Sequence, residues 1–239
     1  MKKSRFLIFI CTIPFLMGFN SNEVILEEGN KPSGKNVAVV QKVVKDVTYR
    51  KDSDQDNWDK AKIGIPLSDG GEVKTGDKSL ALINFTDGSG ILRVRENSIL
   101  NIYGEKRDKK VNKNTFVQKG LIRFEVNKQD EDEEFKFTTP TVVASIRGTD
   151  GFLEFDNDST FTMSLNNGSA LLNFLGQGGG DGSLSGGNTV IITSDGEFNY
   201  REQNEEDLNK SQQAQSEPKK IRVRTPDGEL EIEYYGPQN

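Results

Sequence analysis

The sequence predicts an all-β protein: a single antiparallel β domain, built as a sandwich or flattened barrel of many short strands, with a C-terminal β-hairpin. Three observations support this prediction. Runs rich in Val, Ile, Phe and Thr recur at short spacing through residues 37–200, as they do in sandwiches and barrels. Turn-forming pairs with Gly separate these runs. Apolar residues before residue 200 follow no sustained helical period.

The first residues predict export from the cytoplasm. Lys2, Lys3 and Arg5 form a positive segment, and residues 6–17 form an apolar run of twelve residues. This run is too short to span a bilayer, which needs about 20 residues, but it fits the core of a secretory signal peptide. We therefore expect a signal peptide over residues 1–21 and no membrane span after its cleavage.

Cys11, the only cysteine, raises a lipoprotein as the alternative. The residues before it, Ile8 to Ile10, are not the small residues that a lipid-modification site requires, so Cys11 fits an apolar position of the signal peptide. The cleaved chain has neither cysteine nor histidine. Disulfides are thereby excluded, and so are the common catalytic arrangements of a nucleophile with a histidine base.

The net charge argues against nucleic acid as a partner. The whole chain carries −6, and the chain without its signal peptide carries −9, because Lys2, Lys3 and Arg5 are lost. Phosphate contacts need clustered Lys and Arg, whereas the basic clusters of this chain stand beside acidic residues.

The main domain is predicted over residues 37–200, after a flexible lead-in at residues 22–36. Residues 37–49 carry six valines and one threonine. This β-branched content predicts one strand, or two that join at Lys45-Asp46.

A polar loop follows, in which Asp52, Asp54 and Asp56 occupy alternate positions. This spacing is typical of the start of an EF-hand-like calcium loop. The sixth position is Asn57 rather than Gly, and the twelfth is Ile63 rather than a bidentate Glu. A solvated acidic loop is the favoured interpretation, with a weak metal site at the three aspartates as the alternative.

A hairpin is predicted around Asp87-Gly88. A two-residue type I′ turn needs positive φ at both positions, and Asp-Gly is among the pairs that favour it. Counting outward places Ile83 opposite Leu92 and Ala81 opposite Val94 on an apolar face. The other face pairs Leu82 with Arg93 and is mixed in character.

Four segments complete the predicted domain. Residues 103–114 read as a lysine-rich turn, and residues 115–127 as two strands broken at Gly120. Residues 160–166 and 169–175 form a hairpin around Asn167-Gly168. The glycine-rich residues 176–187 are predicted to be a flexible loop, because no Lys-Ser/Thr follows them as in a phosphate-binding loop.

The tail consists of a polar linker or loose helix at residues 201–220 and a hairpin at residues 221–235. Pro226-Asp227-Gly228 forms the turn of that hairpin. The register sets Arg224 against Glu229 and Val223 against Leu230. A lone hairpin is marginal in water, so we expect this one to dock on the main domain or on a partner.

Three signatures stand in order along the chain and resemble the FecR domain family, a group of exported or periplasmic modules. The first is Trp58-x-x-Ala61-Lys62-x-Gly64, followed by Thr75-Gly76 and by Phe85-x-Asp87-Gly88-Ser89. The second is Gly120-x-x-x-Phe124-x-Val126. The third is Thr139-Pro140, then Ile146-Arg147-Gly148-Thr149 and Asn167-Gly168. The resemblance covers about residues 40–200. It departs from the family pattern after Thr149, where Asp150-Gly151 places the aromatic Phe152 one residue late and indicates a local bulge.

We expect the signature residues to have mainly structural roles. They are Thr75, Gly76, Asp87, Gly88, Ser89, Thr139, Pro140, Arg147, Gly148 and Thr149. The glycines provide positive φ or close backbone approach, and Thr139-Pro140 favours an extended entry. For Arg147 we expect a hydrogen-bonded fork to backbone carbonyls or to an Asp, with ligand binding as the alternative.

The resemblance implies a non-catalytic, exported interaction or sensing module of the cell envelope, linked to signalling or transport regulation. In signalling members of the family, the exported domain receives a signal from an outer-membrane transporter. We expect no counterpart of their cytoplasmic anti-sigma region and spanning helix in this chain. The resemblance therefore implies the exported module rather than the whole transmembrane signalling system. The partner would be another envelope protein. The protein itself would lie in the periplasm or at the cell surface, or would be secreted. No cofactor is expected.

The alternative function is binding of a cell-envelope polysaccharide through loops and exposed tyrosines. The residues that would contact a partner are the weak candidates Arg93, Arg95 and Arg147. A hydrolase would need a pair of carboxylates at suitable spacing, and no spacing in this sequence singles out such a pair. We therefore expect that the protein is not an enzyme.

Overall fold

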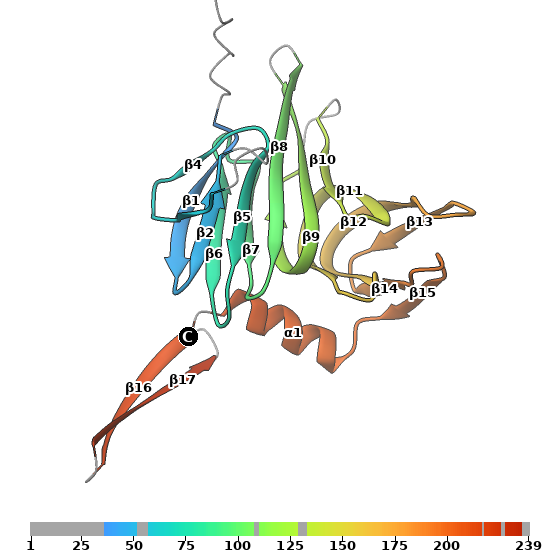
Figure 1. Cartoon of the computed structure of the whole chain (residues 1–239). Coiled ribbons are helices and arrows are strands. Elements are labelled where there is room, and N and C mark those ends of the chain that lie inside the picture. Colours follow the sequence, from blue (N-terminus) through green and yellow to red (C-terminus); the bar gives the residue numbers. More distant parts are fainter. Residues whose placement is uncertain are drawn as a thin grey trace, which may run out of the picture. The chain divides into compact units, whose positions relative to one another are not determined.

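The described part of the chain is almost entirely β structure with one short helix (Figure 1). The computed structural model describes residues 36–51, 57–107, 110–128, 133–216, 218–225 and 228–235, all within one compact unit. The predicted signal peptide, nearly all of the lead-in and Asp52, Asp54 and Asp56 lie outside the described residues. The predicted all-β class is confirmed.

The first half of the chain forms eight strands. They are β1 Ala38–Val44, β2 Val47–Arg50, β3 Asp59–Lys60, β4 Pro66–Leu67, β5 Gly71–Thr75, β6 Leu80–Phe85, β7 Gly90–Val94 and β8 Ile99–Arg107. β1 and β2 meet at the predicted Lys45-Asp46 junction, where Lys45 has a φ of 59°.

The second half contains the longest strands and the helix. The elements are β9 Lys110–Val126, β10 Phe135–Thr138, β11 Val142–Phe155, β12 Phe161–Phe174, β13 Gly180–Ser185, β14 Asn188–Ile192, β15 Phe198–Glu202, α1 Glu205–Gln215, β16 Pro218–Thr225 and β17 Gly228–Tyr235.

Fifteen strands join in one open sheet. Its main path runs β15-β14-β12-β11-β10-β9-β7-β6-β1-β4, and β2, β3, β5, β8 and β13 attach to that path. Among the described strands, only β9 and β10 pair in parallel. The end strands β15 and β4 do not pair with each other, so the sheet is not closed as a barrel would be.

β9 changes its partners along its length, which bends the sheet. Its first part pairs with β8 and β10, whereas residues 120–126 pair with β7 and β11. The change falls at Gly120, which has a φ of 108°. A Cβ there would lie 2.1 Å from the Ser98 Oγ, so only glycine fits this bend. The two strands predicted around Gly120 are therefore one bent strand.

β11 and β12 bend together at a second corner. The register shifts after Arg147, and Gly148 and Thr149 bulge where the paired strand carries Gly168. A Cβ on Gly168 would lie 2.3 Å from the carbonyl oxygen of Gly148. The hairpin predicted around Asn167-Gly168 is wrong, because β12 continues through this pair and stays on β11 on both sides of it.

The core fills the space that the bends enclose. Phenylalanine rings from distant parts of the chain meet in it: Phe85 packs edge-on against Phe135 at a centroid distance of 4.9 Å, and Phe124 lies 4.8 Å from Phe137. Their side chains are fully buried. Apolar alternation along β6, β7 and β10 faces these rings inward. The outer face of these strands is mixed, with Leu82 and Ile91 among polar residues.

The hairpin of β6 and β7 has the predicted register, with Ile83 opposite Leu92 and Ala81 opposite Val94. Its turn is of another type than predicted. Gly88 has a φ of 75°, but Asp87 does not have a positive φ. The Gly88 N–H donates to the Phe85 carbonyl at 3.0 Å, which is the hydrogen bond of a turn one residue earlier than a type I′ turn centred on Asp87-Gly88.

Three other predictions differ from the structure. The turn expected at residues 103–114 is mostly strand, because β8 and β9 continue to Arg107 and from Lys110. The glycine-rich segment contains β13, which pairs with β12. The expected linker or loose helix contains the helix α1, and β15 reaches Glu202 before it.

The C-terminal hairpin forms with the predicted register: Arg224 pairs with Glu229, and Val223 with Leu230. Its two strands make a separate two-stranded sheet. The expectation that this hairpin docks on the main domain or on a partner stays a prediction.

Candidate functional site

The Thr75-Gly76 signature joins three turns of the sheet. The Thr75 hydroxyl donates to the Arg95 carbonyl at 2.5 Å and accepts from the Ser98 N–H at 3.0 Å. The Gly76 N–H donates to the Asp46 carbonyl at 2.8 Å. These bonds lie within the molecule, so the signature positions the turn that carries Arg95.

Asp87 holds a buried cation. Its carboxylate accepts the Ser89 N–H at 3.0 Å and lies 2.7 Å from the Nζ of Lys113, whose side chain is 1% exposed. Burial raises the pKa of Asp87, but the hydrogen bonds from Lys113 and Ser89 outweigh burial and hold this pKa below its usual range. Gly88 also accepts from the Asn127 side chain at 2.7 Å. The turn thus fastens to β9.

The third signature forms the corner of β11 and β12. The Thr139 hydroxyl accepts the Val142 N–H at 2.9 Å and starts β11, while Pro140 is exposed. Gly148 and Thr149 form the bulge opposite Gly168, and Thr149 is buried. The contacts of Thr139, Gly148 and Thr149 thus lie within the sheet.

The three candidate arginines have different surroundings. Arg93 donates to Glu125 on the neighbouring β9 at 2.7 Å. Arg95 is buried and donates to the Ser216 carbonyl at the end of α1 at 3.0 Å. Arg147 is exposed on the outer face of β11, and the structure shows no hydrogen bond or ion pair from it to any described residue. The fork expected for Arg147 is therefore wrong, and Arg147 alone of the three is available for a partner.

The helix α1 begins with a capping box. The Asn204 side chain accepts the Asp207 N–H at 3.0 Å, and the Asp207 carboxylate accepts the Asn204 N–H at 3.1 Å. These bonds satisfy N–H groups that a helix leaves free at its first turn. Asn204 and Asp207, three residues apart before Leu208, could have predicted the helix start from the sequence.

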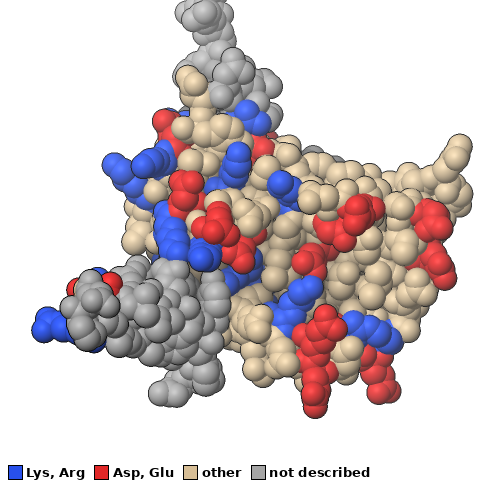
Figure 2. All heavy atoms as spheres, turned by 60° about the horizontal axis from the view of Figure 1, so that its bottom comes forward, with Lys and Arg blue, Asp and Glu red and all other residues tan. Residues whose placement is uncertain are grey.

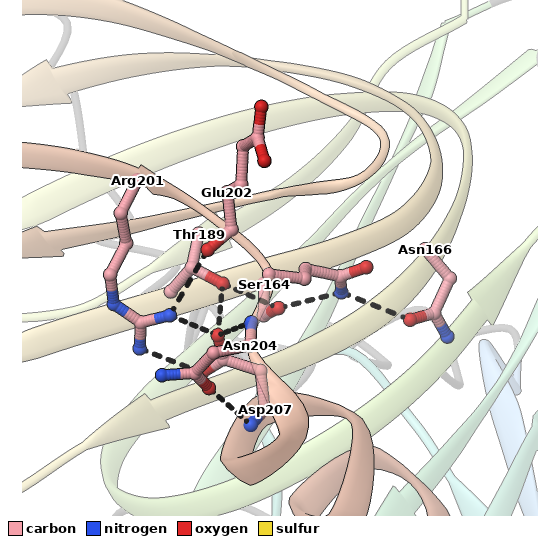
Figure 3. Close-up of polar contacts among 8 residues, drawn as sticks. Ser164, Asn166, Thr189, Arg201, Glu202, Asn204 and Asp207 are labelled. Atoms are coloured by element: carbon pink, nitrogen blue, oxygen red, sulfur yellow. Dashed lines mark hydrogen bonds and ion pairs between the residues drawn. The ribbon is translucent and has the colours of Figure 1, made fainter.

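Asp207 also fastens the helix to the sheet (Figure 3). Its carboxylate receives a bidentate contact from Arg201 on β15 and a hydrogen bond from the Thr189 hydroxyl on β14 at 3.0 Å. Burial raises the pKa of Asp207, but the bonds from Arg201, the Asn204 backbone and Thr189 outweigh burial and lower this pKa. Asp207 is 4% exposed, so its charge is neutralised inside the protein.

The polar contacts continue across the sheet (Figure 3). Thr189 lies 2.8 Å from the Ser164 hydroxyl, and Gln203 donates to Ser164 at 2.8 Å and to Asn166 at 3.1 Å. Asn166 in turn donates to Asp150, the ion-pair partner of buried Arg123. The chain of contacts therefore joins α1 to β14, β12, β11 and β9.

A groove with a volume of about 390 Å³ lies between α1, the ends of β7 and β11, and the bend of β9 at Gly120. Its apolar lining consists of the half-buried Leu121 and the buried Phe155 and Ala214. Its charged lining combines both signs, with Arg95, Glu96, Lys119, Glu154, Asp156 and Lys210. Lys210 bridges the groove to Glu154 at 2.5 Å. On the face that carries α1, acidic and basic side chains are interspersed (Figure 2).

A second cleft, of about 640 Å³, opens beside Tyr103 on β8. It is lined by Asp69, Tyr103, Asn112, Lys113, Asn114, Glu134 and Lys136. The tyrosine ring is 37% exposed. The other lining side chains are all hydrogen-bonding groups, so this cleft is polar with one aromatic surface.

The described residues hold no group of three or more potential metal ligands. They also include no helix that is long and apolar enough to cross a membrane.

The groove beside α1 was not predicted, because its walls come from four segments that are distant in sequence. What it offers chemically is a set of charged and apolar contacts.

Comparisons with known proteins agree with this architecture. Residues 71–171 match the family model described as FecR protein. The search of curated proteins found no match. Among solved structures, a crystal structure of a "putative anti-sigma factor" from Parabacteroides distasonis is similar, with a TM-score of 0.50 and 13% identity over 59% of this chain. A second crystal structure with that description has a TM-score of 0.49.

The solved structures support the fold alone at this identity. The matched region covers 64% of the Parabacteroides chain, less than two thirds of its length. The family match lies on the residues that carry most of the signatures, from β5 through the corner of β11 and β12. The resemblance predicted from the signatures is confirmed, because residues 71–171 of this chain match the FecR family model.

Proposed function

We propose that this chain is an exported, non-catalytic module of the cell envelope that binds another envelope protein through the groove beside α1. In this role the protein senses or relays a signal, as the FecR family resemblance implies. The apolar run at residues 6–17 supports export through a cleaved signal peptide, to the periplasm or the cell surface.

The composition of the groove is the observation that carries this proposal. Protein interfaces combine an apolar centre with polar and charged groups that select the partner. In the groove, the half-buried Leu121 provides apolar surface above the buried Phe155 and Ala214, and charged side chains of both signs surround it. A small anionic or cationic ligand would instead favour a lining of one sign.

The attachment of α1 supports a sensing role. The buried residues of this helix are Asp207, Ser211 and Ala214, so the helix docks with little apolar contact. Its position depends on polar bonds, which a partner can exchange for its own without exposing a large apolar surface. Binding in the groove would therefore be reported by α1.

The proposal is tested by site-specific photocrosslinking in the native envelope. A photoreactive residue at Gln213, on the groove wall, should crosslink one envelope protein, identified by mass spectrometry. The same residue at Ile63, which is 71% exposed on the β3–β4 connection, is the control. Equal crosslinking from both positions, or none from Gln213, would contradict the proposal.

A charge exchange separates partner binding from helix attachment. Lys210→Glu should reduce the Gln213 crosslink and also weaken the bond to Glu154. The double variant Lys210→Glu with Glu154→Lys restores an ion pair within the protein but leaves the charges reversed towards the partner. Crosslinking should stay low in the double variant if the groove charges contact a partner.

Polysaccharide binding remains the second candidate function, and the cleft around Tyr103 favours it. An exposed aromatic ring among hydrogen-bonding groups such as Asn112 and Asn114 suits a sugar ring. Soluble peptidoglycan fragments should then protect Tyr103 from chemical modification, and Tyr103→Ala should abolish their binding. Binding that survives Tyr103→Ala would exclude this cleft as the glycan site.

A further inference from the structure

The strand β13 presents a free edge to solvent. Among the described strands it pairs only with β12, over the six residues from Gly180 to Ser185. The Gly186 N–H donates to the Gly168 carbonyl at 2.9 Å. Because bonded and non-bonded pairs alternate in an antiparallel ladder, the N–H and C=O groups of Asp181, Ser183 and Ser185 face away from β12.

This edge lacks the usual protection. Natural edge strands discourage pairing with lysines, prolines or bulges, whereas β13 has the sequence GDGSLS, with a single charge at Asp181. The Tyr200 hydroxyl lies against Gly182. A side chain, rather than another strand, is thus the neighbour of β13 at this position.

Exposed apolar side chains flank β13 on both of its faces. Leu171 lies opposite Ser183 on the outer face and is 68% exposed. On the inner face, a Cβ at Gly182 would lie 2.0 Å from the Tyr200 hydroxyl oxygen, so the Tyr200 ring covers this glycine and is itself 48% exposed. The small residues Gly182 and Ser183 leave both apolar groups accessible from the free edge.

The charges near β13 differ between its two ends. Asp181 is exposed at the first end. Phe174 pairs with Gly180 at this end and also packs against Gly196. The exposed neighbours of Gly196, Asp195 and Glu197, therefore lie at the same end. At the other end, Arg147 lies across β12 from Ser185, and Glu202 lies opposite Asn188. The first end is therefore acidic, and the second is mixed.

We propose that the free edge of β13 is a docking site for an extended segment of a partner protein, which adds to the sheet as a further strand. Main-chain hydrogen bonds provide the affinity in this mode of recognition, and alternate side chains provide the specificity. The segment carries large apolar residues on both faces, which pack on Tyr200 and Leu171. It carries Lys or Arg at the end that meets Asp181, Asp195 and Glu197.

This site lies on another part of the sheet than the groove beside α1, so each can fail without the other. The test begins with selection of peptides from a phage library of random ten-residue sequences on the full chain. Enriched sequences should alternate apolar and polar residues and carry a basic residue at one end. The most enriched peptide is then synthesised, and its affinity is measured by fluorescence anisotropy.

Two variants block the edge in different ways. Ser183→Pro removes an outward N–H, a change that edge strands tolerate, and Ser183→Lys adds the charge that natural edges use. Each should weaken peptide binding by about tenfold or more, which corresponds to about 1.4 kcal/mol. Asn199→Lys, an exposed position on the edge strand β15, is the matched control and should change the affinity by less than about twofold.

Three outcomes would overturn the proposal. In the first, the selection enriches no peptide. In the second, the enriched peptides bind Ser183→Pro as well as the unaltered chain. In the third, the unaltered chain is a dimer that Ser183→Pro converts to a monomer. The last outcome, measured by light scattering after gel filtration, would assign the edge to a second copy of this chain. Thermal unfolding shows whether each variant is folded, and Ser183→Lys replaces Ser183→Pro if the proline variant is not.

Discussion

Single residues of the family signatures stabilise this protein through specific internal contacts. Asp87 is the clearest case, because it neutralises Lys113, whose side chain is 1% exposed. We expect Asp87→Asn to lower the free energy of unfolding by about 2 kcal/mol. This is less than the roughly 3–5 kcal/mol for one partner of a fully buried pair, since Asp87 is 37% exposed. Urea unfolding followed by circular dichroism measures the change.

Glu125→Gln is the control for Asp87→Asn. It removes the partner of Arg93 in a pair whose carboxylate is 41% exposed, so it should cost less than about 1 kcal/mol. The double variant Asp87→Asn with Lys113→Met should recover much of the loss, because it also removes the buried charge. If Asp87→Asn lowered the free energy of unfolding no more than Glu125→Gln does, the Asp87–Lys113 pair would stabilise the protein no more than an exposed ion pair.

The arginines make a second prediction at this scale. Arg147→Ala should change the stability by less than about 0.5 kcal/mol, because Arg147 is exposed and bonds to no described residue. Arg95→Ala should cost about 1–3 kcal/mol, because it leaves buried groups at the end of α1 without their donor. Thermal unfolding of the two variants compares them directly, and equal losses would contradict the assignment.

The sequence could not distinguish these arginines. Arg93 and Arg95 have the alternation of an outer face, and that pattern does not show that Ser216, far along the chain, covers Arg95. For Arg147, the preceding apolar run suggested burial, whereas the alternation of β11 turns Ile146 inward and leaves Arg147 on the surface. Residue roles here depend on contacts between distant segments, which local patterns do not encode.

The helix α1 is an element held by charge rather than by apolar packing. The pKa of Asp207 is lowered in the folded protein, so its contribution to stability is full above the pKa of the unfolded chain and is lost as the pH falls through the lower, folded value. We expect α1 to detach as the pH falls below the ordinary range of an aspartate carboxyl, about pH 4, while the sheet persists. Amide NMR shifts of α1, compared with those of β6 and β7, follow this change.

Two variants identify the group responsible for this detachment. Asp207→Asn should release α1 already at pH 7 and remove the acid transition. Glu154→Gln, which loses only the half-exposed bond to Lys210, should leave the transition in place. An acid transition that persists in Asp207→Asn would contradict the assignment of this transition to Asp207.

The corner of β11 and β12 makes a prediction for glycine. Gly168→Ala should destabilise the protein by several kcal/mol or prevent folding, since the new Cβ would lie 2.3 Å from the Gly148 carbonyl oxygen. Gly187→Ala is matched in backbone conformation, with a φ of 82° and no atom within 4 Å of its Cβ. It should cost only about 1–2 kcal/mol, the strain of alanine in the left-handed region. Equal costs in urea unfolding would mean that the corner can relax.

A strand or turn could be predicted from the sequence where it depends on nearby residues, and could not where it depends on distant strands. The hairpin of β6 and β7 was predicted to the residue, because alternation and a nearby turn determine its register. The Asn167-Gly168 pair has the same local signal, yet β12 passes through it, because β11 supplies a complementary bulge. A turn signal and a bulge signal look alike in one sequence, since both need a residue with positive φ.

For the whole molecule, the bent strands have a consequence for cooperativity. β9 and β11 each pair with different neighbours at their two ends, and β12 stays on β11 throughout. A part of the sheet therefore cannot unfold without breaking strands that belong to the rest of it. The composition predicted one all-β domain, but it could not show this shared use of strands, because pairing is a property of the complete chain.

We therefore expect the unfolding of the sheet in urea to be a single transition. Trp58 reports on one end of the sheet, where its ring lies 4.8 Å from the Arg50 guanidinium, and far-UV circular dichroism reports on all strands. The two midpoints should coincide, as two-state unfolding requires. The mild variant Gly187→Ala, in the turn between β13 and β14, should shift both midpoints equally, although β5, β8, β9, β11 and β12 lie between Arg50 and this turn. A shift seen by circular dichroism alone would mean that the two ends of the sheet unfold independently, and that the bent strands do not couple their unfolding.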